Sequence, residues 1–257
     1  MKTYLKFLSR NKLYTAIEFI GLSVALAFVI ISFCYVVQQY AVTRENPDRE
    51  RIYAVGDKKD FLNCYGMKEV IDGKLPEVET VSHFHLVQDQ LIHVGEQNFV
   101  GNLFVCDVDF FDIFPVVFKE GSPEMLSQRN AAFITEKLAA KLDNESVDLP
   151  LIVQDDTLHV VGIIAGKGSS LLPEFDVMYN YEDGQSYVIQ SYRDNPFNHW
   201  ANIGTYIKVR PDVDREELAE KLEALCDTQF ENSPTWQGLM MVRFDELFFH
   251  TRLHQPE

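Results

Sequence analysis

Three histidines are spaced so that they could bind a metal ion. His83 and His85 lie two residues apart in a predicted strand and therefore share one face, and His93 follows in the next predicted strand. A hairpin could bring all three together, as a zinc site requires. However, no fourth ligand occurs at a fixed spacing, and histidines on a partly exposed sheet face are the simpler interpretation. We therefore predict no metal ion here.

Three aspartates, Asp107, Asp109 and Asp112, have the alternating spacing of calcium ligands. An EF-hand loop also needs Gly at its sixth position and Glu at its twelfth, and Phe110 and Phe111 interrupt the pattern. We interpret these aspartates as loop and helix-cap carboxylates.

Other chemistry-bearing motifs are incomplete. Gly166 to Ser170 has the residue types of a phosphate loop but lacks the GxxxxGK[ST] spacing, so we predict a flexible loop. No G-x-S-x-G elbow occurs. Glu216, Glu217, Glu220 and Glu223 are typical of a solvated helix face. We predict no catalytic residue, no cofactor and no enzymatic activity, and the sequence assigns no binding residue.

Four cysteines give no metal spacing and no disulfide framework. Cys34 lies in an apolar segment, and Cys64, Cys106 and Cys226 are far apart in the chain. One pair among these three could form in an oxidising compartment, but the sequence does not determine which.

One uncharged stretch of nineteen residues, Phe19 to Val37, is long enough to cross the hydrocarbon core of a membrane as a helix. It is too long for a typical signal peptide, and the following QQYAVTRENP contains no A-x-A cleavage site. We therefore predict a retained anchor rather than a cleaved signal.

Charge is distributed unevenly about this anchor. Lys2, Lys6, Arg10 and Lys12 precede it, and no acid occurs before Glu18. The positive-inside rule then predicts a cytoplasmic N-terminus, with everything after about Gln39 outside. The tip either lies as an amphipathic helix on the inner membrane surface or only sets the topology. Without these four bases and Glu18, 38 acids and 19 bases remain, so the outer part carries −19, which argues against nucleic acid as a partner.

The outer part has alternating strand and helix patterns. Predicted helices cover 61–72 and 214–230, the latter capped by Asp214. The sequence NAAFITEKLAAKL predicts a strand running into a helix with Thr135 as its N-cap. Phe110, Phe111, Phe114 and Phe118 predict a helical turn and loop packed into a core. The remaining predicted strands are 51–55, 78–87, 90–94, 98–106, 151–153, 158–164, 187–190, 205–209 and 237–244.

This pattern predicts an α+β fold in two subdomains. The first and last parts have a β–α–β rhythm, whereas the middle is mainly β, which indicates one subdomain inserted into another.

A series of motifs in a fixed order carries a family resemblance. They are SRNKLYTAIEFIGLSVALA, ERIYAV, LPEVETV, DFFDIFPVVFKEGSP, NAAFITEKLAAKL, VVGIIA and YIKVRPDVDREELAEKL. The chain resembles the N-terminal part of a MacB/FtsX-type ABC transporter permease with its MacB-like periplasmic core domain, in the style of permeases from Bacteroidetes.

The resemblance implies a domain organisation. It comprises a cytoplasmic tip at 1–17, a transmembrane helix at 18–40, a Porter-like subdomain at 41–82 and 199–257, and a mainly β Sabre-like insertion at 83–198. It also implies a location in the bacterial inner membrane, with the main domain in the periplasm.

The resemblance further implies a function and partners. Such permeases couple ATP hydrolysis by a cytoplasmic ATPase subunit to mechanotransmission or efflux, usually as a homodimer or with a permease partner, and in one branch with a periplasmic adaptor.

The sequence departs from the family pattern in three respects. It holds no ATPase domain, and it ends at His254 to Glu257, about where a second transmembrane helix would begin. We expect either a truncated permease or the product of a gene that lost its permease half. The family's loop after VVGIIA is altered at Gly166 to Pro173.

Two alternative functions remain. One is a single-pass extracytoplasmic receptor or sensor that signals through a partner protein, because seventeen cytoplasmic residues cannot form an output domain. The other is a tethered extracytoplasmic enzyme, for which the sequence shows no nucleophile–base set.

Overall fold

A computed structural model describes most of the chain and divides it into two compact units. The first unit is Met1–Val42 and the second is Thr43–Glu257. The described residues are 12–43, 46–58, 62–95, 97–142, 150–153, 156–166, 172–180, 187–197, 200–233 and 236–249. The basic tip before Lys12 therefore lies outside the described residues, as do Arg44 and Glu45.

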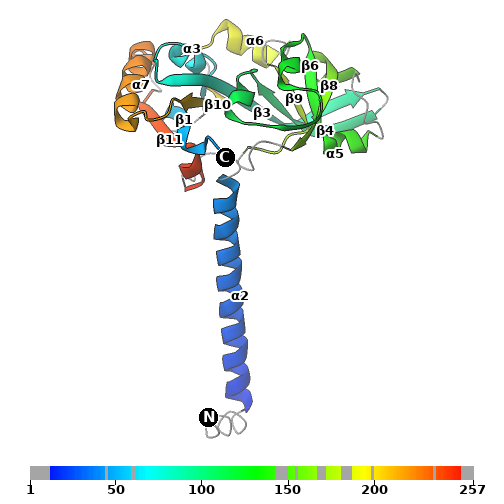
Figure 1. Cartoon of the computed structure of the whole chain (residues 1–257). Helices are drawn as coiled ribbons and strands as arrows, with labels where there is room; N and C mark the ends of the chain where they lie inside the picture. The colour runs from blue at the N-terminus through cyan, green and yellow to red at the C-terminus, as the bar shows by residue number, and fades with distance from the viewer. Residues whose placement is uncertain are drawn as a thin grey trace. The chain divides into compact units, whose positions relative to one another are not determined.

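The first unit is built on one long helix, α2 (Lys12–Thr43) (Figure 1). Its segment Thr15–Cys34 is long and apolar enough to cross a membrane, and none of it is buried in the protein. An apolar helix with no protein covering it requires an apolar solvent, which a lipid bilayer supplies. The predicted anchor lies within this helix.

Within the described residues of the second unit, eleven strands join into one sheet. The main path runs β11-β1-β10-β3-β4-β9-β6-β8-β5, with β2 paired to β10 and β7 paired to both β3 and β8. The strands are β1 (Ile52–Asp57), β2 (Leu62–Cys64), β3 (Val78–Val94), β4 (Gln97–Cys106), β5 (Val117–Glu120), β6 (Ala131–Thr135), β7 (Pro150–Val153), β8 (Asp156–Gly166), β9 (Val177–Asn180), β10 (Trp200–Val209) and β11 (Leu239–Arg243).

Part of this sheet closes into a ring, called here the strand ring. In the described part, β3 pairs with β4, β4 with β9, β9 with β6, and β6 with β8. Strand β7 then bridges β8 back to the far end of β3. Along the same edge of the strand, the first half of β3 pairs with β10 instead. The long strand β3 thus belongs both to the strand ring and to the open end of the sheet.

Short helices flank the sheet. They are α3 (Met67–Ile71), α4 (Phe110–Ile113), α5 (Glu136–Lys141), α6 (Tyr187–Asp194) and α7 (Arg215–Phe230), with 3-10 turns η1 (Arg49–Arg51), η2 (Pro123–Ser127) and η3 (Phe244–Phe249). Two predicted caps are confirmed: Thr135 Oγ1 accepts from the Leu138 N–H, and Asp214 accepts from the N–H groups of Glu216 and Glu217.

Buried apolar side chains of the described residues form three clusters. The ring core, with Ile92, Val105, Ile134 and Leu151 among its members, lies within the strand ring and against α5. The helix-covered core includes Met67, Ile71, Val81, Leu218 and Leu222, and α3 and α7 cover it. The aromatic core contains Phe84, Phe104, Phe110, Phe114, Phe133, Phe175 and Phe244. It confirms the predicted packing of Phe110 and Phe114.

Three predicted elements were wrong. Residues 61–72 are not one helix, because Leu62–Cys64 pairs with β10 as strand β2 and only Met67–Ile71 is helical. The buried Asn63 stabilises this strand, donating to the Val55 carbonyl and accepting from Thr205 Oγ1. Side-chain hydrogen bonds to neighbouring strands thus outweigh local helix propensity.

The other two errors concern strands. The predicted strands 78–87 and 90–94 are one strand, β3, with a register shift between Val87 and Gln90 where Asp89 has φ +53°. The predicted strand 187–190 is the start of helix α6. A short apolar run does not distinguish strand from helix.

Candidate functional site

The three histidines that were considered as metal ligands do not come together in the structure. His83 and His85 are buried side by side in β3, and burial lowers the pKa of His83 to about 3 and of His85 to about 4. Both are therefore neutral at physiological pH. His93 lies at the other end of the same strand, where its Nδ1 is 2.5 Å from Asn98 Oδ1. Among the described residues, no group of three His, Cys, Asp or Glu could hold a metal ion.

The aspartates instead form a polar network around Asp107. This carboxylate accepts from Ser82 Oγ at 2.8 Å, from the His83 N–H at 3.0 Å and from Lys68 Nζ at 3.0 Å. Lys68 also donates to Asp109 at 2.5 Å. Burial raises the pKa of Asp107 despite these bonds. Burial lowers the pKa of Lys68, but the two carboxylates outweigh it, so this pKa rises. The network connects α3, β3 and the start of α4.

The structure also locates the glutamates, the cysteines and the glycine loop that were considered in the sequence. On α7, Glu217 pairs with Lys221 and Glu223 with Lys58. Cys64, Cys106 and Cys226 are free and buried, and burial raises the pKa of Cys64 to about 11 and of Cys226 to about 12. Cys34 is also free. Of the predicted flexible loop, Gly166 ends β8, and the rest lies outside the described residues.

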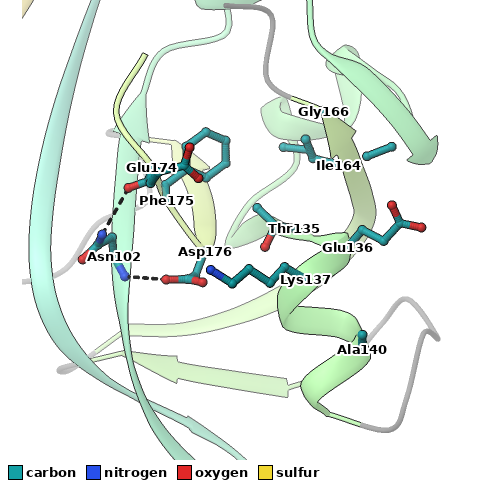
Figure 2. Close-up of a pocket in the computed structure, with 11 residues that line it drawn as sticks. Asn102, Thr135, Glu136, Lys137, Ala140, Ile164, Gly166, Glu174, Phe175 and Asp176 are labelled. Atoms are coloured by element: carbon teal, nitrogen blue, oxygen red, sulfur yellow. Dashed lines mark hydrogen bonds between the residues drawn. The ribbon is translucent and has the colours of Figure 1, made fainter. Parts of the chain in front are cut away.

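A cleft at one end of the strand ring is the best candidate for a binding site (Figure 2). Its volume is about 600 Å³, within the range of small-molecule pockets. Four separate parts of the chain line it: Asn102 of β4, the β6–α5 junction, the end of β8, and the segment before β9. The lining residues are Asn102, Thr135, Glu136, Lys137, Ala140, Ile164, Ala165, Gly166, Glu174, Phe175 and Asp176.

Asp176 lines this cleft and is held by hydrogen bonds to two other segments. Its N–H donates to the Asn102 carbonyl at 2.8 Å, and its carbonyl accepts from the Thr135 N–H at 3.0 Å. Its carboxylate accepts from the Asn102 N–H at 2.9 Å. A Cβ at Gly101 would lie 2.9 Å from Asp176 Oδ2 and 2.8 Å from Ile92 Cδ1, so a larger residue there would force these two side chains to shift. Backbone groups of Asn102 and Thr135 thus fix the position of Asp176, and the Asn102 N–H also orients its carboxylate.

Charged, polar and apolar side chains line the cleft together. Figure 2 shows the Lys137 side chain pointing toward Asp176, with Phe175 and Ile164 nearby. Lys119 pairs with Glu136 at 3.1 Å on its rim. Among its lining residues, the one hydroxyl belongs to Thr135, whose oxygen caps α5, and no histidine is present to activate it.

This cleft could not be recognised in the amino-acid sequence. Its lining comes from segments separated by up to about seventy residues, with no motif spacing between them. The single signal available was the cap at Thr135, which locates Glu136 and Lys137 in the first turn of a helix.

The fold defines a class of protein: a strand-rich mixed α/β domain that follows a helix able to span a membrane. Residues 15–225 match the family of MacB-like periplasmic core domains, and the chain belongs to this family. This membership confirms the resemblance to MacB/FtsX-type ABC transporter permeases. The chain therefore carries the periplasmic core domain of such a permease, anchored to a membrane.

Two solved structures have a similar fold. A domain described as part of a permease from Porphyromonas gingivalis aligns with a TM-score of 0.65 at 18% identity, covering 82% of this chain and 95% of that one. The periplasmic region of MacB from Actinobacillus actinomycetemcomitans aligns with a TM-score of 0.60 at 11% identity, covering 83% and 97%. No curated protein matches the chain in sequence.

Proposed function

We propose that this chain works with a separate cytoplasmic ATPase, as the anchor and periplasmic core of a transporter that performs mechanotransmission or efflux. The observation that carries the proposal is the family match over residues 15–225, which spans both the apolar helix and most of the domain. The protein would lie in the bacterial inner membrane with its N-terminus in the cytoplasm. The basic residues before the helix support this orientation.

Partners follow from the membrane segment. The described residues contain one helix suited to spanning a bilayer, and a single helix cannot enclose a translocation path. We propose a second copy of the chain or a permease partner beside this helix. A periplasmic adaptor would extend the path in efflux, and the protein would perform no chemistry of its own.

The domain organisation remains part of this proposal. The Porter-like subdomain would comprise 41–82 and 199–257, and the Sabre-like insertion 83–198. The division of the core supports it, since most of the helix-covered core comes from the first set of residues and most of the ring core from the second.

Affinity purification tests the proposal. The chain, tagged at its C-terminus in its native bacterium, is extracted with detergent and its partners are identified by mass spectrometry. We expect an ATPase with a Walker A loop to co-purify, and an untagged strain is the control. Absence of any ATPase would contradict the proposal. Protease added to intact spheroplasts should digest the domain, and protection would contradict the orientation.

The cleft favours a second candidate function, that of an extracytoplasmic receptor acting through a partner. Its volume and mixed lining suit a small amphipathic ligand. A thermal-shift screen of the purified chain tests this function. A ligand that raises the melting temperature of the native chain should lose this effect in Asp176→Asn, and an unchanged shift would exclude this cleft.

A further inference from the structure

Two oppositely charged side chains line the cleft from different segments. Lys137 lies in the first turn of α5, and Asp176 lies in the segment before β9. The Lys137 side chain is directed toward Asp176 (Figure 2). Within the described residues, however, Lys137 Nζ has no hydrogen-bond or ion-pair partner. The cleft thus presents an ammonium and a carboxylate that do not neutralise each other through direct contact.

The carboxylate of Asp176 is oriented with one oxygen to spare. Its Oδ2 accepts from the Asn102 N–H at 2.9 Å, and no group of the described residues donates to its Oδ1. Asn102 Nδ2 also donates to the Glu174 carbonyl at 3.1 Å, so Asn102 is bonded on both sides of Phe175. A carboxylate that is oriented in advance loses little further entropy when it accepts a hydrogen bond from a ligand.

The backbone that carries Lys137 is also well fixed. Thr135 caps α5, and Leu138, which directly follows Lys137, is buried in the ring core. The neighbouring Glu136 pairs with Lys119 at 3.1 Å. Among the described lining residues Lys137 is therefore the single base, and its flexible four-carbon stem lets the ammonium adjust to a bound anion.

Apolar and small residues form most of the remaining lining. Ala140, Ala165 and Gly166 have short side chains or none, which helps to leave a volume of about 600 Å³ open. Phe175 and Ile164 add apolar surface (Figure 2). Small-molecule sites typically combine such apolar walls with a few polar groups that orient the ligand. A ligand complementary to this lining carries an ammonium, a carboxylate and an apolar group.

We propose that the cleft binds a small zwitterion with an apolar side chain, an α-amino acid or a dipeptide. Both charged groups of such a ligand are ionised at neutral pH. Its carboxylate accepts from Lys137 Nζ, its ammonium donates to Asp176 Oδ1, and its apolar group lies against Phe175. The proposal deepens the receptor function proposed above by naming the ligand class, and it rests on that function for the consequence of binding.

Calorimetric titration of the purified full chain in detergent tests the ligand class with four probes. Free L-leucine and the dipeptide leucyl-leucine carry both charges, N-acetyl-leucine keeps only the carboxylate, and leucinamide keeps only the ammonium. We expect at least one zwitterion to bind, and both single-charge probes to bind about tenfold more weakly, because each lacks one charged hydrogen bond. The tighter of the two zwitterions identifies the source as amino acid or dipeptide.

Two results of this titration would overturn the proposal. One is a single-charge probe that binds as tightly as the better zwitterion. The other is the absence of binding by both zwitterions at concentrations up to about 10 mM, which is weaker than two oriented charged contacts should give.

Matched variants assign each charge of the ligand to its partner. Lys137→Met should weaken zwitterion binding about tenfold and leave leucinamide binding unchanged, because this probe has no carboxylate to lose a contact. Asp176→Asn should weaken zwitterion binding similarly and leave N-acetyl-leucine binding unchanged. Lys141→Met removes an exposed charge from the same helix outside the cleft lining and should leave every affinity at its native value.

Circular dichroism verifies that each variant is folded, and Lys137 and Lys141 are both exposed, so their replacement should not disturb the core. Equal losses in Lys137→Met and Lys141→Met would indicate a general effect of charge and would overturn the assignment of Lys137.

Failure of this proposal can be distinguished from failure of the proposed functions. If neither zwitterion binds but another compound in the thermal-shift screen does, the receptor function stands and the ligand class is wrong. If a zwitterion binds with these charge requirements and no ATPase co-purifies, the ligand class stands and the transport function fails.

Discussion

The edges of the sheet are protected in different ways at the two ends of the domain. At one end, the described strands close into the strand ring, in which β7 pairs with both β3 and β8. At the other end, β11 pairs with β1 alone among the described strands, and α7 packs beside it. In Figure 1, α7 with β11 and β6 with β8 lie at opposite ends of the domain. Closure removes exposed edges, whereas a short edge strand beside a helix limits them.

This difference shows which parts of the domain connect its ends. The ring core and the helix-covered core lie mainly at opposite ends, but the aromatic core includes Ile52 and Val242 from one end and Phe133 and Ile164 from the other. Strand β3 and the Lys68–Asp107 network also join them. We therefore expect the two ends to unfold together.

The largest expected effect on the free energy of unfolding comes from the aromatic core, to which both ends of the domain contribute. Phe104 is fully buried, with ring centroids 4.7 Å from Phe84, 5.1 Å from Phe110 and 5.0 Å from Phe175. Phe104→Ala should cost about 4 kcal/mol through lost packing and a cavity. Urea unfolding of the detergent-solubilised chain, followed by tryptophan fluorescence and circular dichroism, measures it. Both signals should still change at one midpoint, and two separate midpoints would show that the ends are independent.

A somewhat smaller effect is expected where α3 meets β3 and α4. Lys68→Met leaves the largely buried Asp107 carboxylate without its counter-charge, which should cost about 3 kcal/mol. Adding Asp107→Asn should recover part of this loss, because the uncompensated charge is then removed. The same unfolding measurement tests it. If the double variant were less stable than Lys68→Met alone, the charge pairing would not explain the effect.

Substitutions at the two helix caps allow the stability of the two ends to be compared directly. Thr135 caps α5 beside the strand ring, and Asp214 caps α7 at the open end. Replacement of either by Ala should cost about 1 kcal/mol. If the domain unfolds as one unit, each variant lowers the single midpoint of urea unfolding. A loss confined to one spectroscopic signal would indicate separate units.

The smallest effect concerns pH and the Asp48 carboxylate, which pairs with Arg51 and Lys208. The pKa of Asp48 is lowered in the folded protein, so its stabilisation is complete above the pKa of the unfolded chain, about 3.9. It is lost as the pH falls through the lower folded value. The difference in melting temperature between native chain and Asp48→Asn should thus stay constant from about pH 7 to about pH 5 and shrink below about pH 3.9. A difference that already disappears near pH 5 would contradict this pKa shift.

Much of the local structure could be predicted from the sequence. The apolar run at 19–37 predicted the long helix, and the caps at Thr135 and Asp214 predicted the starts of α5 and α7. These features depend on neighbouring residues, through helical periodicity and side-chain bonds to nearby N–H groups. The order of motifs also identified the family.

The errors arose where distant pairing decides the structure. Residues 62–64 have a helical pattern but pair with β10, and β3 continues through Asp89 because β4 supports both sides of the shift. A hairpin between His85 and His93 could have brought the three histidines together, but the structure has none at this point. All three lie in one continuous strand, with His93 at the far end from His83 and His85. The three side chains therefore cannot bind one metal ion together.

The sequence by itself determined the anchor, the charge distribution, the mixed α and β elements and the family, since each of these is written in contiguous residues. Tertiary structure alone decided that six strands close into a ring in the described part, that Asp176 lines a cleft together with Asn102 and Thr135, and that Asn46 is buried and bonded to the Ile113 carbonyl. The physical reason is that these features consist of hydrogen bonds and packing between segments far apart in the chain. A sequence pattern carries no information on which distant partner satisfies a given polar group.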